Sequence, residues 1–366
     1  MSGKILFFID NLHLGGKERR FIELLYFLAR RKDYEMQIVV VDDRIDYKYI
    51  YDLDIQIIIL GRKLLRRDPS VFFRFYKIAQ KFKPDIIHTW SYMTTVYAIP
   101  VKLLLRCPII ANLISDVEKG YGEWSFSNFF FKISCYYSDY ILANSIAGTE
   151  SYGIDRNKCK VIYNGINLER FKEKIDYQKV RKEIGINTEF IVIMVASFSR
   201  RKDYGFFIDV AKKVGFKNKK VTFIGVGDGS LLQAMQDRIK SEKVSNVLFT
   251  GRKNNIESII SISDIGVLFS EAEGISNSIL EYMALAKPVI TTDIKGGSRE
   301  IIENNKSGFI IKKDIKLIAD KIAELLNNKN MRCTIGIEAR KQVEIKFSLE
   351  NMGEHYLNIY NIFLGG

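Results

Sequence analysis

The sequence predicts an α/β fold made of two doubly wound, parallel-sheet domains of similar size. Short runs rich in isoleucine and valine recur along the chain, longer stretches with helical spacing separate them, and the whole pattern restarts near residue 190. Continuous aliphatic runs are typical of strands in a parallel sheet, because crossover helices bury both faces of such a sheet. A chain of 366 residues is long for one domain and sufficient for two.

The first half of the chain alternates strand and helix patterns. Apolar residues from Phe21 to Leu28 recur at helical spacing, which predicts a helix over residues 17–31, and a similar pattern predicts another over 72–82. Alternation of this kind indicates βαβ units. Strands are expected at residues 4–9, 36–43, 55–60, 85–90, 108–114, 140–144 and 159–164.

The second half repeats the arrangement and sets the expected domain boundaries. We expect a first Rossmann-like domain over residues 1–168 and a second over 169–346, joined by a tight hinge because no linker is rich in Pro, Gly or Ser. The final segment, residues 347–366, is a helix candidate that no strand follows, and we expect it to pack back on the first domain. Strands are expected at residues 190–197, 220–227, 246–251, 264–270 and 308–311, and helices at 203–214 and 230–241.

Composition and charge narrow the class of protein. Hydrophobic residues make up 47% of the chain and charged residues 27%, which is typical of a globular protein. The formal net charge of +13 favours anionic partners, namely nucleic acid, an anionic membrane surface or phosphorylated small molecules. The sequence contains no signature of a nucleic-acid-binding module, so we expect no nucleic-acid partner.

Cysteine usage and apolar segments bear on localisation. The four cysteines are scattered and histidines do not cluster, so we expect neither a zinc site nor a disulfide framework, but a reducing cytosol. The apolar run before Asp10 is too short for the core of a signal peptide, and no stretch approaches the ~20 apolar residues that span a bilayer. We therefore expect a cytoplasmic protein, with peripheral membrane association as a further expectation.

The stretch EAEGISNSILEYMALAKPVITTDI, residues 271–294, combines two glutamates with small polar residues at an expected helix start. The free N–H groups and the dipole at such a helix end form an anion site, to which Asn277 and Ser278 add small donors. Glu281 lies one turn further and can accept two hydroxyl hydrogen bonds, as from a ribose. The alternative is that Ser278 and Glu281 form a capping box, in which Glu281 only satisfies the helix backbone.

The residues 270–311 resemble the signature of glycosyltransferase family 4, whose members have the GT-B fold. Glu273 and Glu281 match the family's pair of glutamates separated by seven residues. The resemblance implies an α/β, GT-B architecture in which two Rossmann-like domains face a central cleft. Further segments that resemble family motifs, in the expected order, are LGGKE (14–18), ILANS (141–145), VIYNGINLERF (161–171), VASFSRRK (195–202), GVGDG (225–229) and VLFTGR (247–252).

The resemblance also implies roles for individual residues. Lys202 would neutralise the donor diphosphate and Glu273 would contact the sugar hydroxyls; both are candidate catalytic residues. Asp116 is a third candidate, because it is the nearest titratable group where the family often has a histidine and this chain has Ile114. His88 is expected on the acceptor or sugar side. Donor-binding roles fall on Gly15, Gly16, Ser197, Lys202, Arg252, Asn277, Ser278, Ile279 and Glu281.

Several of these positions have simpler interpretations. Ser197 stands where the family often has an arginine, which removes a phosphate-binding cation. Lys202 could be a solvated member of the RRK run, Arg252 an ordinary surface arginine, and His88 a structural histidine at a strand end. Gly15 and Gly16 could serve only as a turn before a helix.

The function implied by the resemblance is transfer of a sugar, with retention of configuration, from a nucleotide-sugar to a glycan or lipid-linked glycan acceptor. The expected context is synthesis of bacterial surface polysaccharide, with no metal and no cofactor, since Lys202 and a helix dipole can meet the charge of the leaving diphosphate. A nucleotide-sugar epimerase-like GT-B enzyme and a non-catalytic partner that binds nucleotide-sugar or membrane stay open as alternatives.

Two weaker patterns are typical of other kinds of site. A dinucleotide site would use Asp42 at the end of the second expected strand, but neither glycine-rich loop has the spacing that such a site requires. The DLD segment at residues 52–54 matches a metal motif of the other large glycosyltransferase fold, but a solvated strand entry explains it better.

Residues 62–83 are strongly basic and contain interleaved aromatic residues, with Asp68 as the one acid among them. A basic segment with aromatic residues is suited to the interface of an anionic membrane. A second aromatic segment, residues 121–137, belongs to the same expected domain. The alternative for both segments is that the aromatic side chains pack in the core.

Overall fold

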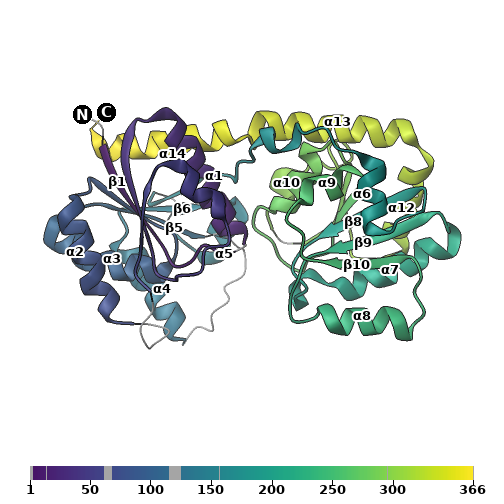
Figure 1. Ribbon diagram of the computed structural model, residues 1–366, viewed down its shortest axis with the longest axis horizontal. Helices are drawn as coiled ribbons and strands as arrows, with labels where there is room; N and C mark the ends of the chain where they lie inside the picture. Colours follow the sequence, from purple (N-terminus) through teal and green to yellow (C-terminus); the bar gives the residue numbers. More distant parts are fainter. Residues whose placement is uncertain are drawn as a thin grey trace. The chain divides into compact units, whose positions relative to one another are not determined.

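The computed structural model describes residues 3–13, 15–61, 68–114, 125–155, 157–294 and 296–365, and these fall into two compact units (Figure 1). Unit 1 consists of Met1–Gly165 and Leu349–Gly366, and unit 2 of Ile166–Ser348. The boundaries expected from the sequence, after residues 168 and 346, fall within a few residues of these divisions.

Unit 1 is built on a parallel sheet whose strand order, among the described residues, is β3-β2-β1-β4-β5-β6-β7. The order reverses direction at β1, as in a doubly wound sheet, and β1 pairs in parallel with both β2 and β4. All of the strands expected in this half are present. They are β1 (Gly3–Ile9), β2 (Tyr34–Val40), β3 (Gln56–Ile59), β4 (Ile86–Thr89), β5 (Ile109–Ile114), β6 (Tyr140–Ala143) and β7 (Cys159–Val161).

The helices of unit 1 cover both faces of this sheet. Along β1, Phe7 packs in one cluster with residues of the first and last helices, and its neighbour Phe8 packs on the other face with Phe75 of the second helix. Successive side chains of a strand point to opposite faces, so a continuous apolar run is what two covered faces require. The helices are α1 (Gly16–Arg31), η1 (Lys48–Leu53), α2 (Ser70–Phe82), α3 (Tyr92–Leu105), α4 (Phe126–Tyr137), α5 (Ile146–Tyr152) and α14 (Leu349–Leu364).

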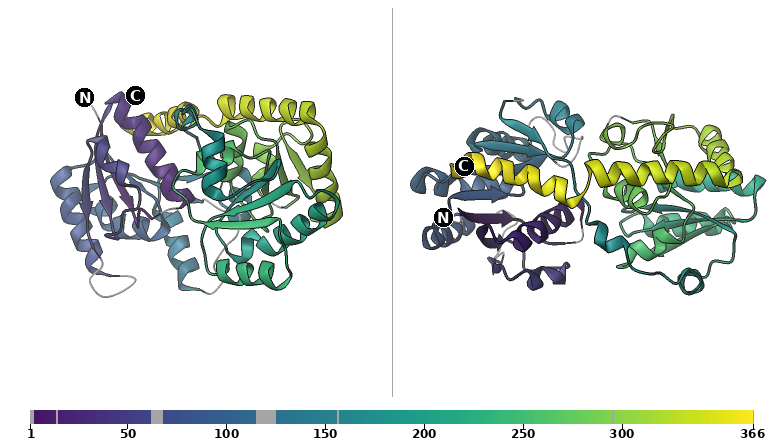
Figure 2. Two further views of the ribbon diagram at one scale, coloured as in Figure 1. Left: turned by 45° about the vertical axis from the view of Figure 1, so that its right-hand side comes forward. Right: turned by 90° about the horizontal axis from the view of Figure 1, so that it is seen from above.

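The last helix, α14, packs against α1 and the sheet of unit 1, as Figure 2 shows. Gly353 allows α14 to lie close to α1, because a Cβ at this position would come within 2.3 Å of the Phe27 ring. Tyr356 and Tyr360 of α14 are fully buried. The final segment of the chain is thus part of the core of unit 1.

Unit 2 repeats the doubly wound design with a parallel sheet of order β10-β9-β8-β11-β12-β13 among the described residues. Its strands are β8 (Phe190–Val195), β9 (Val221–Val226), β10 (Val247–Gly251), β11 (Ile265–Leu268), β12 (Val289–Thr292) and β13 (Phe309–Ile311). Its helices are η2 (Leu168–Phe171), α6 (Tyr177–Ile184), η3 (Arg200–Lys202), α7 (Tyr204–Lys217), α8 (Leu232–Ser241), α9 (Ile256–Ser261), α10 (Asn277–Ala284), α11 (Ser298–Ile301), α12 (Ile315–Asn327) and α13 (Lys329–Lys346).

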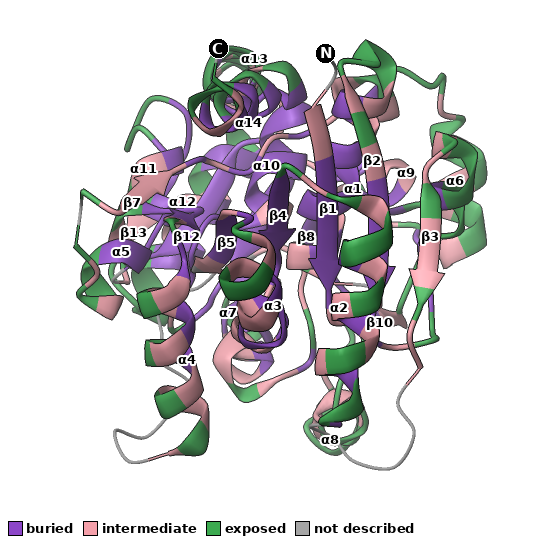
Figure 3. Ribbon diagram, turned by 90° about the vertical axis from the view of Figure 1, so that its left-hand side faces the viewer, coloured by how far each residue is buried: buried purple, intermediate pink, exposed green. Residues whose placement is uncertain are grey.

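Helices α2 and α4 contain buried, half-buried and exposed residues (Figure 3). Their aromatic residues divide between core and surface. Phe75 and Phe131 are buried, as the core-packing interpretation expects, whereas Phe73 and Phe129 are 61% and 58% exposed. Residues 62–67 and 121–124 of the two segments lie outside the described residues. In the part of the chain that the structure describes, no helix is both long enough and apolar enough to cross a membrane.

Candidate functional site

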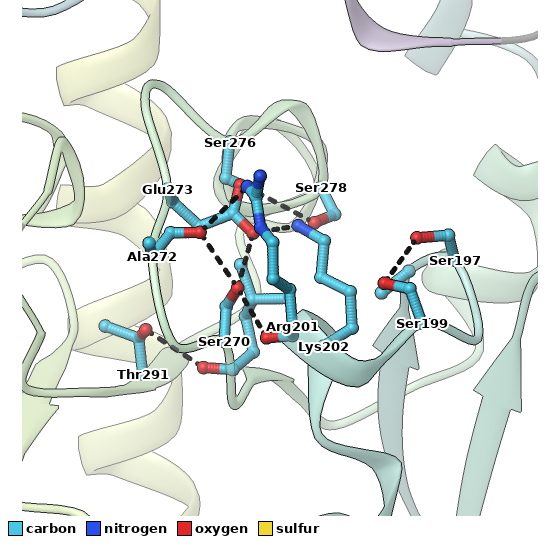
Figure 4. A network of polar contacts seen from close by, with 12 residues as sticks. Ser197, Ser199, Arg201, Lys202, Ser270, Ala272, Glu273, Ser276, Ser278 and Thr291 are labelled. Carbon is cyan, nitrogen blue, oxygen red and sulfur yellow. Dashed lines mark hydrogen bonds and ion pairs between the residues drawn. The ribbon is translucent and has the colours of Figure 1, made fainter. Parts of the chain in front are cut away.

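Two predicted catalytic residues, Lys202 and Glu273, form an ion pair in unit 2 (Figure 4). Lys202 ends η3, which follows β8, and Glu273 follows the neighbouring strand β11. The strands are parallel, so their carboxyl ends meet at one edge of the sheet. Ser270 Oγ donates a second hydrogen bond to Glu273 Oε1 at 2.7 Å. The carboxylate therefore lies between a cation and a hydroxyl donor, and only 10% of its side chain is exposed.

Backbone hydrogen bonds hold the loop that contains Glu273 on both of its sides. The carbonyl of Arg201 accepts from the N–H of Glu271 at 2.8 Å, which joins the loop after β8 to the loop after β11. On the other side the N–H of Gly297 donates to the Glu273 carbonyl at 2.9 Å. Gly296 has a φ of 157°, and a Cβ there would lie 2.3 Å from that carbonyl oxygen. A glycine is required at this position both by its conformation and by the close approach.

Helix α10 begins at Asn277, directly after this loop. Ser276 is its N-cap residue but its hydroxyl caps no backbone N–H, and bonds instead to the Ser278 hydroxyl at 3.0 Å. Ser278 is thus the second residue of the helix, and Glu281 lies in the second turn. The capping box considered from the sequence, with Ser278 as cap and Glu281 as its partner, is not formed.

Glu281 instead contacts Arg170 from η2. The guanidinium Nη2 lies 3.5 Å from Glu281 Oε1, and the same arginine donates from Nε to Glu257 Oε1 at 2.9 Å and from Nη2 to the same oxygen. The Glu281 side chain is only 3% exposed. Its carboxylate is buried beside a cation. A buried charge needs such a partner, because removal of an unpaired charge from water costs much free energy.

Tyr282, the neighbour of Glu281, fixes α10 on the sheet. Its hydroxyl accepts the backbone N–H of Val195 at 2.6 Å, at the end of β8. The ring lies against β11 at Gly266, where a Cβ would come within 2.3 Å of it. Burial raises the pKa of the Tyr282 hydroxyl above its ordinary value. The tyrosine therefore stays a neutral hydrogen-bonding group that sets the distance of α10 from the strands.

The other predicted donor-binding residues of unit 2 lie near strand ends. Ser197 follows β8, and its hydroxyl bonds to that of Ser199 at 3.3 Å. Arg252 is exposed directly after β10. Ile279 is completely buried in α10, so its side chain packs in the core of unit 2. Nothing in the structure tests a ligand role for these residues, and those roles stay predictions.

In unit 1, Gly15 is the N-cap of α1 and is extended, with a φ of −157°. Gly16 is the first residue of that helix. A Cβ at Gly15 would lie 2.3 Å from Glu18 Oε2, so the acid of the first turn occupies the space beside the glycines. Lys17 lies between Asp10 and Glu18. Burial alone would lower the pKa of Lys17, but the two carboxylates together outweigh burial, so its pKa is raised above the ordinary value.

His88 lies in β4 with none of its surface exposed. Its Nδ1 bonds to the Tyr360 hydroxyl of α14 at 2.7 Å, and its ring packs among Phe7, Trp90 and Tyr356. Burial, and next the charge of Arg20, hold the pKa of His88 well below its ordinary value. This environment agrees with the structural interpretation, and contact with a sugar stays a prediction.

Asp116 and the side chain of Ile114 lie outside the described residues. Among the residues that are described, no group of three or more His, Cys, Asp or Glu side chains is placed to hold a metal ion. Sequence reasoning gave no role to Arg170 or Glu257, because their contacts join segments far apart in the chain.

Family models and relatives agree with this architecture. Residues 14–170 match the model of Glycosyltransferase Family 4, and residues 176–342 match the model of Glycosyl transferases group 1. The capsular polysaccharide biosynthesis glycosyltransferase CapM of Staphylococcus aureus is 30% identical over 55% of this chain and 53% of its own length. The poly(ribitol-phosphate) α-N-acetylglucosaminyltransferase of S. aureus strain COL is 32% identical over 48% of this chain. The match spans only 36% of that second relative.

A solved structure shows the same fold over the whole chain. Anabaena HepE, crystallised in complex with UDP-glucose, superposes with a TM-score of 0.85 at 21% identity, over 98% of this chain and 99% of its own. The likeness at this identity concerns the fold. The chain thus has the GT-B fold, and its two halves match, in turn, the models of a family 4 and a group 1 glycosyltransferase domain.

Proposed function

We propose that this protein transfers a sugar from a nucleotide-sugar to a glycan or lipid-linked glycan acceptor, with retention of configuration, in the synthesis of a bacterial surface polysaccharide. The observation that carries the proposal is the meeting of Lys202, Glu273 and the start of α10 at the carboxyl edge of the unit 2 sheet. A cation, an acceptor for hydroxyl groups and the N–H groups of a helix start are suited to a sugar diphosphate. Unit 2 is the donor-binding unit in this proposal.

The leaving group of such a transfer is a nucleoside diphosphate, whose charge grows as the bond to the sugar breaks. Lys202 and the N–H groups of Asn277 and Ser278 would stabilise that charge without reorganising, because the clamped loops hold them in place. Glu273 would then accept hydrogen bonds from hydroxyls of the transferred sugar. Without a donor, Lys202 and Glu273 neutralise each other, which keeps two charges of a largely buried site paired.

The acceptor side of the proposal rests on unit 1. Gly15 and Gly16 would let the backbone approach the donor phosphate, and Asp116 is the proposed titratable group near the reacting sugar. The proposal names no protein nucleophile. UDP is the first nucleotide to test, because the Anabaena structure contains UDP-glucose.

We also propose that unit 1 associates peripherally with an anionic membrane through the outer face of α2, α3 and α4. Helix α3 packs against both of the others, and the three helices contain five Lys or Arg residues and no Asp or Glu. Two of these cations pair with acids outside the helices, Arg74 with Asp68 and Lys102 with Asp139. Exposed apolar side chains beside cations are suited to the boundary between lipid headgroups and acyl chains. The exposed apolar residues of this face are Phe73, Leu103, Leu104, Phe126, Phe129 and Tyr136.

Vesicle sedimentation tests the membrane proposal. The wild-type protein should bind vesicles of phosphatidylcholine with phosphatidylglycerol, bind pure phosphatidylcholine weakly, and dissociate as salt screens the charges. A Leu103→Ser/Leu104→Ser variant should bind the anionic vesicles about fivefold or more weakly, since two apolar side chains no longer enter the interface. The matched control is Ile337→Ser/Ile345→Ser, on equally exposed residues of α13. Equal binding by all three proteins would refute the proposal.

The glycosyltransferase proposal is tested first by a thermal-shift panel of UDP, ADP and GDP and their sugars, with and without chelator. A ligand that binds only the folded state raises the melting temperature, and indifference to chelator would agree with binding that needs no metal. Product analysis then separates the alternatives. A changed sugar on the donor, formed without any acceptor, would indicate an epimerase-like enzyme, and binding without turnover across a range of glycan acceptors would indicate a non-catalytic partner.

A further inference from the structure

We infer that Arg170 is a positioning residue for Glu281, which it holds in the place where the carboxylate accepts the hydroxyls of the donor ribose. The inference rests on the proposed function, because Glu281 contacts a ribose only if unit 2 binds a nucleotide. It adds to that function a residue outside the loops that surround Lys202 and Glu273, in the segment directly after the division between the units.

Arg170 contacts two carboxylates of unit 2, and this pairing is the basis of the inference. Its Nε and Nη2 donate to Glu257 on α9, and Nη2 also lies 3.5 Å from Glu281 Oε1. The bonds to Glu257 orient the guanidinium, and the same guanidinium attracts the carboxylate of Glu281. A carboxylate has about four acceptor positions, so contact with an arginine is compatible with hydrogen bonds from ribose hydroxyls.

Burial explains why Glu281 needs such a partner. Its side chain is 3% exposed, whereas those of Arg170 and Glu257 are 21% and 17% exposed. A buried carboxylate without a positive neighbour is costly, and the rigid fork of an arginine can serve two carboxylates at once. The arginine itself is fixed, because its guanidinium carbon lies 5.3 Å from the ring centre of the buried Phe171.

If Arg170 had a purely structural role, its substitution would lower only the stability of the protein. If Arg170 positions Glu281, its substitution also changes how well the protein distinguishes a ribonucleotide from its 2′-deoxy form. The experiment measures dissociation constants by calorimetry for UDP, ADP and GDP, each beside its 2′-deoxy form, on the full chain. If Glu281 accepts the ribose 2′-hydroxyl, the wild-type protein should bind the ribo form about tenfold more tightly, since a hydrogen bond to a charged group is lost in the deoxy form. Glu281→Gln should reduce this ratio to about twofold or less, because the charged acceptor is gone.

Arg170→Gln should also reduce the ratio of the deoxy to the ribo dissociation constant by about threefold or more. Residue 281 is still a glutamate in this variant, but its carboxylate is no longer held in place. Arg170→Lys keeps the charge without the fork and should retain part of the ratio, which gives a second variant if Arg170→Gln does not fold. The matched control is Arg238→Gln. Arg238 bonds to two carboxylates of unit 2, Asp209 and Glu242, neither of them a predicted donor residue, and the variant should keep the wild-type ratio.

The outcomes separate the inference from the function it rests on. If the wild-type protein discriminates and both Arg170 variants keep the full ratio while Glu281→Gln loses it, the inference is overturned and the proposed function stands. If nucleotides bind with equal affinity for ribo and deoxy forms, Glu281 does not hold the ribose and the inference is again overturned. If no diphosphate binds the wild-type protein, the proposed function itself fails.

Discussion

Lys202 and Glu273, separated by 71 positions in the sequence, form an ion pair at the carboxyl edge of the unit 2 sheet. Ser270 Oγ holds the same Glu273 oxygen at 2.7 Å. If Lys202 binds a donor diphosphate, as we propose, the diphosphate competes with Glu273 for the lysine, and this competition gives the site a measurable signature.

Glu273→Gln should strengthen binding of UDP and weaken sugar transfer. Removal of the carboxylate frees Lys202 and removes a negative charge near the diphosphate, so UDP affinity should rise about threefold. Transfer should fall about tenfold or more, because the sugar hydroxyls lose a charged acceptor. Calorimetry and steady-state kinetics measure the two effects. The control is Glu271→Gln, on an exposed carboxylate two residues earlier, which should change neither UDP affinity nor the rate of transfer. Weaker UDP binding by Glu273→Gln would contradict the account.

Glu281→Gln should lower nucleotide affinity with little effect on the melting temperature. The capping box of Ser278 with Glu281 is not formed, glutamine keeps the shape of the side chain, and Arg170 still pairs with Glu257 in the variant. If the helix did depend on Glu281 for capping, the loss would be about 1 kcal/mol of unfolding free energy with nucleotide affinity unchanged. A thermal-shift measurement with and without UDP distinguishes the two results.

Gly266→Ala should destabilise unit 2 by about 1–3 kcal/mol, because the added Cβ would overlap the Tyr282 ring in a fully buried position. Gly205→Ala is the control. There a Cβ would meet only side-chain atoms of Arg238 and Asp203, at 3.3 and 3.4 Å, and alanine favours helix α7 by up to about 1 kcal/mol. Urea unfolding measures both, and equal stabilities of the two variants would show that α10 can move away from the sheet.

The stability of unit 1 should fall in acid because of His88. Its pKa in the folded protein lies below the unfolded value of about 6.5, so the unfolded chain binds the proton first as the pH falls. The stability that neutral His88 provides is complete above pH ~6.5 and falls below it, by up to about 1.4 kcal/mol per pH unit.

The measurement for His88 is urea unfolding at pH 7.5 and pH 5, followed by tryptophan fluorescence. One of the two tryptophans, Trp90, has its ring 5.2 Å from that of the histidine. His88→Gln should lose less stability between the two pH values than the wild-type protein. His355→Gln, on an exposed histidine of α14, should behave like the wild type. An identical pH dependence in the wild type and His88→Gln would contradict the assignment of a buried, neutral His88.

The fold could be predicted from the sequence largely because its strands are buried on both faces. Each aliphatic run named from the sequence is part of a strand, and the reversal of strand order at β1 and β8 follows from the doubly wound pattern. Helix α3 was not expected. Its residues are apolar on most sides and include Pro100, so the stretch has neither the helical periodicity nor the composition that identifies a surface helix.

The candidate site could be predicted only in part. The loop with Glu273 and the helix start at Asn277 were identifiable because they are contiguous and carry a family signature. Arg170 and Glu257 were not, because the arginine lies 87 positions from Glu257 and 111 from Glu281, and only the folded sheet brings α9, α10 and η2 together. The burial of His88 against Tyr360, 272 positions away, depends on the fold in the same way.

The central claim is that a nucleoside diphosphate binds at the start of α10 with Lys202 as its cation, and calorimetric titration with UDP and with uridine tests it most directly. The proteins are the wild type, Lys202→Met and the control Lys212→Met, on a lysine that bonds to Glu242 on the surface of unit 2. Lys202→Met should weaken UDP about tenfold or more and leave uridine unchanged, since a charge-assisted bond to the diphosphate is lost. Equal UDP affinity in all three proteins would contradict the account.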